Sequence, residues 1–447
     1  GAGIDLRVLA FTAAVAAAVA IAFGLVPLLQ LRRLDLQTTL KAQAGRGGTA
    51  GREGRRFRSA LVVAEVALAV ALVIGAGVLL RSFWALAGVD PGFRTANVLK
   101  AEYQLPQARY PLDFSRWPNL PEIHGFHAEL LRRVRALPGV ESAAIAARHP
   151  LDPGFTNSFV VVGREAEAAD WPEIRCRFVT PGYLETMAVP LLAGRALGEG
   201  DGAGETPVGV INQAAAERYF AGLEPLGQEL RFWGVPWRIV GVVGDERFHG
   251  LAEDAEPAIY APILQAPQQG AVLLARTSGD PGALAGAIRR AVHELDPALA
   301  LYGVEPLEET VAASIARPRF TATLLALFGG VAILLALVGV HGVLSYTVAQ
   351  RGPEVAVRMA LGATRRDVVG LVVRDGAGLA ALGTALGLAG ALAGGRLLSS
   401  LVFGVTPRDA ATFAVVAVGV MAMAALASWL PARRAARADA LAALRSE

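Results

Sequence analysis

Residues 350–376, QRGPEVAVRMALGATRRDVVGLVVRDG, form a short basic segment between two apolar runs, each long enough to cross a membrane. Pro353 suits the first position of a helix, where its missing N–H costs nothing. Glu354 and Arg358 then lie four residues apart on one helix face, in the favourable acid-before-base order. The segment therefore predicts a short helix at the membrane surface.

The residues that follow predict a sharp turn into a second helix. Gly362 is placed to end the first helix, and Thr364 with Asp367 forms a capping-box-like start for the next one. A surface helix between two spans is well placed to pass force from a soluble partner to the membrane helices. The alternative interpretation is an ordinary basic loop on the cytoplasmic side of the membrane.

Composition restricts the class of protein. The chain is 54% hydrophobic with a net charge of only +3, so no strong field points to nucleic acid. Its single cysteine, Cys176, excludes an intrachain disulfide framework and a cysteine-rich metal site. Its only lysines, Lys41 and Lys100, do not follow a G-x-x-x-x-G run, so the chain has no P-loop of its own.

Apolar runs predict a transmembrane bundle of five helices, because a bilayer core of about 30 Å needs roughly 20 apolar residues per helix. The predicted spans are residues 8–30, 59–80, 320–346, 376–395 and 410–430. An island of ordinary soluble composition separates the second span from the third. The fold class is therefore a membrane protein with five spans and a large extracytoplasmic α+β domain.

Basic residues in the short loops set the orientation. Residues 31–58 carry eight basic side chains against Asp35 and Glu53, whereas 396–409 has only Arg396 and Arg408. Residues 351–374 and the C-terminal tail are also rich in arginine. The basic segments share one side when the spans alternate, so the island is extracytoplasmic and the C-terminus is cytoplasmic.

Two similar segments predict an internal duplication. Residues 27–43, PLLQLRRLDLQTTLKAQ, align without gaps with residues 431–447, PARRAARADALAALRSE. Both segments follow an apolar helix. We interpret the first span as the end of a preceding repeat and the remainder as a second repeat.

The island has strand-like and helix-like runs in mixed order. The strand-like runs are 97–105, 158–163, 207–212, 236–243 and 271–277, and the helix-like runs are 121–136, 213–220 and 281–295. His124 and His127 have the spacing of a shared metal site, but no third ligand accompanies them. A solvated helix face is the favoured interpretation of the pair.

Two features inside the spans are candidates for function. Glu65 is the only acidic residue within a span, and we expect a structural or coupling role rather than a transport site. Gly383, Gly387, Gly390 and Gly394 form two G-x-x-x-G pairs that predict a helix-packing surface.

The chain resembles the MacB/FtsX-like family of ABC transporter permeases. The most specific parts are EVAVRMALGATRRDVVGLVVRDG (354–376), PARRAARADALAALR (431–445) and RSALVVAEVALAVALVIGAGVLLRSF (58–83). Within the island, FVTPGYLETMAVPLLAGR (178–195) and WRIVGVVGDERFHGL (237–251) are similar to the family's periplasmic domain. The leading helix resembles the duplicated permeases of this family, so this chain corresponds to their C-terminal repeat.

The resemblance implies a domain order. It assigns residues 1–30 to the last helix of a preceding repeat, 31–58 to a cytoplasmic linker, 59–83 to a transmembrane helix, 84–316 to a MacB-like periplasmic domain, and 317–447 to an FtsX-like permease domain with three helices.

It also implies a mechanism without catalysis by this chain. A separate ATPase subunit is expected to dock on the coupling loop, residues 351–366, and to use ATP there, while this chain binds no cofactor or metal. The matching docking residues are Glu354, Val357, Arg358, Met359, Leu361, Gly362 and Arg365. Movement of this loop would tilt the spans and reshape the periplasmic domain, which is mechanotransmission rather than passage through a pore.

Three functions stay open at this level. The favoured one is a permease for efflux or extraction of a peptide, lipid, lipoprotein or drug-like substrate, in the bacterial inner membrane. The others are a membrane-anchored sensor and an FtsX-like regulator of a cell-wall hydrolase. Besides the ATPase and lipid, the expected partners are a preceding repeat or second copy and a periplasmic adaptor or substrate protein, with no nucleic acid.

Overall fold

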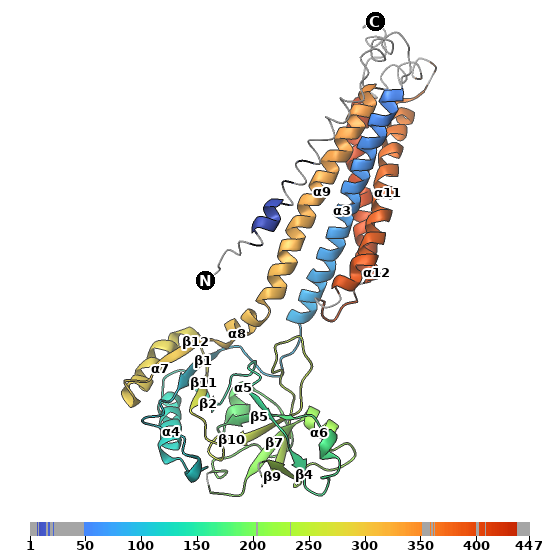
Figure 1. The fold of residues 1–447 in the computed structure, drawn as a ribbon. Coiled ribbons are helices and arrows are strands. Elements are labelled where there is room, and N and C mark those ends of the chain that lie inside the picture. Colours follow the sequence, from blue (N-terminus) through green and yellow to red (C-terminus); the bar gives the residue numbers. More distant parts are fainter. Residues whose placement is uncertain are drawn as a thin grey trace. The chain divides into compact units, whose positions relative to one another are not determined.

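The computed structural model describes two compact units (Figure 1). The described residues are 7, 9–14, 17, 21, 49–202, 204–232, 234–350, 358, 361, 363–398, 402–406 and 408–435. The helical unit lies within Gly1–Ala71, Val331–Gly390 and Val415–Glu447, and the sheet unit comprises Leu72–Gly330 and Ala391–Ala414. Each unit is considered by itself below.

Within the described residues, four helices are long and apolar enough to cross a membrane. They are α3 (Thr49–Ala87), α9 (Ala316–Gln350), α11 (Arg365–Leu398) and α12 (Ala410–Ala435). They correspond to four of the five predicted spans. The remaining span, 8–30, and most of the linker, 31–58, lie largely outside the described residues.

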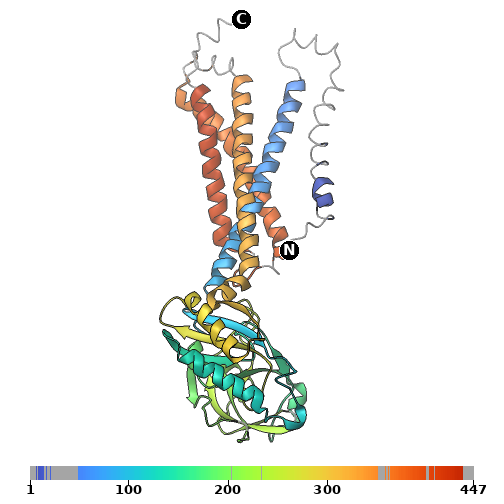
Figure 2. The ribbon, with the colours of Figure 1, turned by 90° about the vertical axis from the view of Figure 1, so that its left-hand side faces the viewer.

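The four helices run side by side in both views (Figures 1 and 2). Half of the apolar window of α3 is buried within the protein, compared with at most 28% for each of the other three windows. The helix α3 is therefore the one that the others surround most closely. The 35 residues of α9 span about 52 Å at 1.5 Å per residue, well beyond a hydrocarbon core of about 30 Å.

The island is an α+β domain built on one mixed twelve-stranded sheet. Its main path runs β12-β1-β11-β2-β5-β10-β7-β9-β8-β4, with β3 beside β5 and β6 beside β9. The strands are β1 (Val98–Gln104), β2 (Val140–Ala146), β3 (Phe155–Asn157), β4 (Val160–Val161), β5 (Ile174–Val179), β6 (Leu191–Gly194), β7 (Val208–Asn212), β8 (Glu229–Phe232), β9 (Val235–Val243), β10 (Ala258–Pro262), β11 (Gly270–Thr277) and β12 (Leu301–Pro306). Most neighbours are antiparallel, whereas β5 with β10 and β7 with β9 are parallel.

Short helices cover the sheet. The helices α4 (Pro121–Arg135) and α7 (Pro281–Leu295) pack against each other and begin with a proline in the first turn, where no N–H is needed. The others are α5 (Tyr183–Met187), α6 (Gln213–Tyr219) and α8 (Leu307–Ser314), which directly precedes α9.

Alternate residues of one strand enter different hydrophobic clusters, as the two-residue period of a strand requires. In β11, Leu273 joins the larger cluster under α4 and α7, whereas Val272 and Leu274 join the second. The second cluster also contains Leu86 of α3 and Leu307 of α8. We call it the root cluster, because it packs the sheet against the end of α3 and the start of α8.

Candidate functional site

The predicted coupling segment, residues 351–366, carries an exposed apolar side chain. Leu361 is 83% exposed, the highest value among the large hydrophobic residues of the described part. Arg358 is helical and exposed, and Arg365, also exposed, begins α11. Three of the seven predicted docking residues are thus exposed. The other four, Glu354, Val357, Met359 and Gly362, lie outside the described residues.

The turn into α11 is fixed by backbone and side-chain hydrogen bonds. The N–H of Ala363 donates to the carbonyl oxygen of Arg358 at 3.0 Å. The N–H of Thr364 donates to Asp367 Oδ2 at 2.8 Å, and the N–H of Asp367 donates back to Thr364 Oγ1 at 3.4 Å. The predicted capping box is therefore present, and it fixes the start of α11.

Glycines set the closest approach of α11 to α3. A Cβ atom added at Gly383 would lie 2.7 Å from Val66 Cβ, and one at Gly387 would lie 2.6 Å from the Ala67 carbonyl oxygen. At Gly390 and Gly394 an added Cβ would meet no described atom within 4 Å. Of the two predicted G-x-x-x-G pairs, the first lies against a neighbouring helix and the second does not.

Glu65 lies on α3 and faces α9. Its carboxylate occupies the space that a side chain at Gly339 would enter. Nearer the start of α3, the Arg58 guanidinium lies 4.0 Å from the centroid of the Tyr346 ring on α9. These two contacts tie the helix that enters the island to the helix that leaves it.

The other ends of the long helices are also linked within the sheet unit. Arg81 of α3 forms an ion pair with Asp409, which precedes α12, and Ser82 Oγ accepts the N–H of Phe403 at 2.7 Å. Asp409 Oδ2 also accepts the N–H of Thr412 at 2.9 Å and so caps α12. The Thr412 hydrogen bonds, together with Arg81, lower the pKa of the Asp409 carboxyl.

A buried acid organises the interior of the island. Glu246 is fully buried and accepts hydrogen bonds from the hydroxyls of Tyr183, at 3.0 Å, and Tyr260. Burial raises the pKa of Glu246, opposed by the positive charge of Arg177 and by the two tyrosine hydroxyls. The Arg177 guanidinium donates to carbonyl oxygens, including that of His149 at 2.9 Å. Sequence reasoning missed this network, because Tyr183 and Glu246 lie 63 residues apart in the chain.

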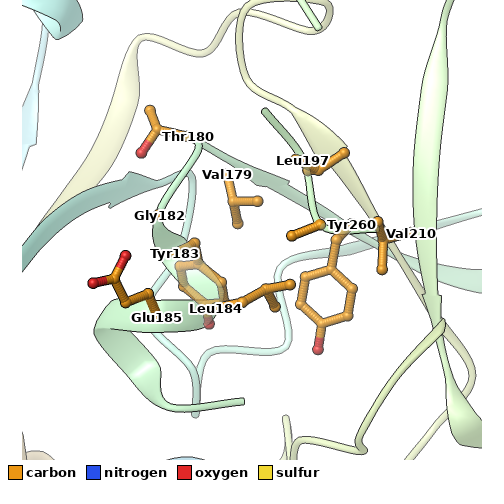
Figure 3. Close-up of a pocket in the computed structure, with 10 residues that line it drawn as sticks. Val179, Thr180, Gly182, Tyr183, Leu184, Glu185, Leu197, Val210 and Tyr260 are labelled. Atoms are coloured by element: carbon orange, nitrogen blue, oxygen red, sulfur yellow. The ribbon is translucent and has the colours of Figure 1, made fainter. Parts of the chain in front are cut away.

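The two tyrosine rings line a cavity of about 210 Å³ (Figure 3). Its other walls are mainly apolar, with Val179, Leu184, Leu197 and Val210 among them. A second cavity, of about 340 Å³, adjoins it and is lined by several charged side chains. Gly182 and Glu185 line both cavities.

The histidine pair on α4 is not a solvated face. His127 is only 1% exposed, and burial lowers its pKa to about 3, with a smaller contribution from His124. The prediction is wrong for His127 because this residue shares the packed face of α4 with Ile123 and Phe126. Among the described residues, no group of three or more histidine, cysteine or carboxylate side chains is arranged to hold a metal ion.

Two family models match the chain. The MacB-like periplasmic core domain matches residues 59–291, more than half of the chain, and the FtsX-like permease C-terminal domain matches residues 326–440. The first description agrees with an extracytoplasmic island carried on membrane helices.

Curated relatives match more than half of the chain. The pyoverdine export ATP-binding/permease protein PvdT of Pseudomonas entomophila is 30% identical over 279 residues, which are 58% of this chain and 41% of that protein. The macrolide export ATP-binding/permease protein MacB of Azoarcus sp. is 25% identical over 268 residues, with 58% and 40% covered. The uncharacterized ABC transporter permease YknZ of Bacillus subtilis is 27% identical over 280 residues, with 60% and 69% covered.

The chain spans about two fifths of the length of the two export proteins. Its two family matches, in the order periplasmic domain and then permease domain, cover most of its own length. The chain is a membrane protein with an extracytoplasmic domain, and it belongs to the MacB/FtsX-like family of ABC transporter permeases.

Proposed function

We propose that this chain is the permease subunit of an ABC transporter and is driven by a separate ATPase subunit that docks on residues 351–366. The observation that carries the proposal is the exposure of Leu361 between the exposed Arg358 and Arg365. An exposed leucine flanked by arginines suits a protein interface that buries an apolar centre within a charged rim. The lack of a P-loop lysine in this chain is consistent with ATP being hydrolysed by the partner.

The proposed mechanism is mechanotransmission along α3. A push on the coupling segment reaches α11 through the Thr364–Asp367 capping box. The helix α11 contacts α3 closely at Gly383 and Gly387, and Glu65 extends that contact from α3 to α9. The far end of α3 enters the root cluster of the island. Movement of the loop would therefore displace the base of the sheet domain.

The proposed location is the bacterial inner membrane, with the island outside and the C-terminus in the cytoplasm. The arginine-rich segments 31–58 and 351–374 support this orientation. Cys176 is buried, so added cysteines provide clean probes. In intact cells, a membrane-impermeant maleimide should label Gly279→Cys on the island and should not label Leu361→Cys. Labelling in the opposite pattern would reverse the proposed topology.

The proposed process is export or extraction of a peptide, lipid, lipoprotein or drug-like molecule. The names of the two exporter relatives, which refer to pyoverdine and macrolides, support an outward direction. A second copy or a preceding repeat is the proposed partner in the membrane, with an adaptor or substrate protein on the extracytoplasmic side.

The docking test uses the full chain purified from membranes of its host in mild detergent. Photolabelling with azido-ATP followed by mass spectrometry should identify a co-purified P-loop ATPase. Leu361→Asp and Arg358→Asp should each remove most of the labelled subunit. Arg408→Asp, an exposed charge reversal in the other short loop, is the matched control and should retain it. Retention of the ATPase by the two coupling-segment variants would refute docking at this segment.

A further inference from the structure

Two arginines of the helical unit lie over aromatic rings near the ends of the long helices. The Arg58 guanidinium, near the start of α3, lies 4.0 Å from the centroid of the Tyr346 ring on α9. The Arg433 guanidinium lies 5.1 Å from the centroid of the Trp429 ring, one turn earlier on α12. Tyr346 is 43% and Trp429 46% exposed, and both arginines are exposed. The two arginine–aromatic pairs therefore lie on the surface of the helical unit.

A shared contact places the two pairs at the same level of this unit. A Cβ atom added at Gly376 of α11 would collide with Ser428 Oγ and lie 2.7 Å from Leu344 Cδ1, so α9, α11 and α12 meet there. Tyr346 lies two residues beyond Leu344 on α9, which is about 3 Å along the helix axis. Trp429 directly follows Ser428 on α12. Both rings thus lie within one helical turn of the same meeting point.

Positive charge predominates at this level. Among the described side chains within two residues of Arg58, of Gly376 or of Arg433, the other charged groups are Arg56, Arg374 and a single acid, Asp375. All of these charged side chains are exposed. Four arginines against one aspartate leave a surplus of positive charge, which favours an anionic partner.

The two stacked arginines keep their hydrogen-bond donors available. Within the part of the chain that the structure describes, Arg58 and Arg433 contact the aromatic rings and form no ion pair. A guanidinium that lies on an aromatic face directs its planar fork of N–H donors sideways, away from the ring. This fork matches two oxygens of a phosphate group. Each pair is therefore suited to bind a phosphate.

The neighbouring side chains favour a membrane lipid as the source of this phosphate. Val338 of α9 and Leu426 of α12 are 69% and 67% exposed, and they belong to the same apolar spans as the two rings. Aromatic rings at the end of an apolar span lie at the headgroup level of a bilayer. A phospholipid places its phosphate at this level and its acyl chains along the exposed apolar side chains. A soluble phosphate makes only the first of these contacts.

We propose that the Arg58–Tyr346 and Arg433–Trp429 pairs each bind the headgroup of an anionic phospholipid, with the guanidinium donating to the phosphate oxygens. The first pair joins α3 to α9, and α9 directly precedes the predicted coupling segment. A bound headgroup would therefore stabilise the contact between these two helices. Any effect on ATPase docking rests on the function proposed above, whereas lipid binding itself does not.

The test uses the full chain purified in mild detergent, freed of co-purified lipid and without any ATPase. Native mass spectrometry would compare the binding of phosphatidylglycerol and phosphatidylethanolamine, with identical acyl chains, from an equimolar mixture. An arginine near an anionic lipid surface contributes about fivefold in affinity. The anionic lipid should therefore be bound about five times more than the zwitterionic one. Glycerol 3-phosphate at the same concentration should not displace it, because it has no acyl chains.

Variants locate the preference. Arg58→Gln combined with Arg433→Gln should lower the ratio of bound phosphatidylglycerol to phosphatidylethanolamine to about one. Arg408→Gln, an exposed change in the loop between α11 and α12, is the matched control and should leave the ratio unchanged. Arg58→Lys combined with Arg433→Lys keeps the charge and loses the planar fork, so it should give an intermediate ratio of about two. Unfolding temperatures would verify that each variant is folded.

Specific outcomes overturn the proposal. A ratio near one in the unmodified chain would exclude selection of the anionic lipid, and an unchanged ratio in the double glutamine variant would place the selection elsewhere. An unchanged ratio in the double lysine variant would exclude the stacked guanidinium geometry. Displacement by glycerol 3-phosphate would assign the two pairs to a soluble phosphate. None of these results bears on ATPase docking at Leu361, so the two proposals fail separately.

Discussion

The Glu65 carboxylate lies where the side chain of residue 339 would begin, so glycine at position 339 and glutamate at position 65 are sterically matched. The contact joins α3 to α9, the helices on either side of the island. Because the Glu65 side chain fills the space beside Gly339, it also restricts sliding of α3 and α9 past each other. The pair is therefore a specific contact and not a consequence of general hydrophobicity.

Gly339→Ala should displace the carboxylate and reduce stability in detergent modestly, by about 1 kcal/mol. In a Glu65→Ala background the same change should cost nothing, because the colliding atoms are gone. Thermal unfolding of the four proteins gives a double-mutant cycle. Gly342→Ala, which meets no described atom within 4 Å, is the control. If Gly339→Ala and Gly342→Ala lower the unfolding temperature equally, the contact between Glu65 and Gly339 is not specific.

Gly387→Ala should be more harmful than Gly339→Ala. Its new methyl group meets the backbone carbonyl oxygen of Ala67, and backbone cannot rotate out of the way as a carboxylate can. We expect a loss of about 1–3 kcal/mol, since α11 and α3 must separate. Gly390→Ala lacks such a neighbour. If the two variants unfold at the same denaturant concentration, the close approach of α11 to α3 is not as described.

Protonation of His127 should destabilise the island in acid. The folded pKa is about 3, whereas an unfolded histidine has a pKa near 6.5. Between these values the unfolded state binds more protons, so stability falls as pH decreases below 6.5, by up to about 1.4 kcal/mol per pH unit. Above that pH the group has no effect.

His127→Leu should therefore flatten the decrease in unfolding temperature between pH 7 and pH 5. His293→Leu, on the exposed side of α7, should leave the decrease unchanged. An identical pH dependence of wild type and His127→Leu would show that another group causes it.

Asp409 has two separable tasks, an ion pair with Arg81 and the cap of α12. Asp409→Asn should keep the cap, because asparagine is as good a capping residue, and lose only the ion pair. Asp409→Ala should lose both and unfold at a lower temperature than Asp409→Asn. The lowered pKa of Asp409 means that its stabilisation is lost as pH falls. Equal unfolding temperatures of the two variants would contradict the capping role.

The strands and helices that local patterns predicted in the island are present, although the twelve-stranded sheet has more strands than the five predicted. The predicted helix 281–295 coincides with α7, and the predicted strand 207–212 differs from β7 by one residue. Both segments have clear boundaries: Asp280 and Pro281 start the helix, and Asn212 caps the next one. The capping box at the start of α11 could also be predicted from the sequence, because Thr364 and Asp367 are only three residues apart.

Features that depend on distant partners were not predictable. The strand β5 is buried along its whole length although it contains Arg175 and Arg177. Those arginines are satisfied by partners elsewhere in the chain, such as the carbonyl oxygens of Pro153 and His149. An alternation of apolar and charged residues normally indicates a half-exposed strand. The Glu246 network and the cavity beside it were missed for the same reason.

The antiparallel pairing of β1 with β12 brings the first and last strands of the island into contact, with Leu99 opposite Pro306. More than two hundred residues thus leave and rejoin the membrane helices through neighbouring strands. Because both ends of this insertion lie on paired strands, we expect its interior to tolerate changes in sequence while the attachment point keeps its geometry. We therefore expect recombination between relatives to exchange the extracytoplasmic domain while the membrane helices stay the same.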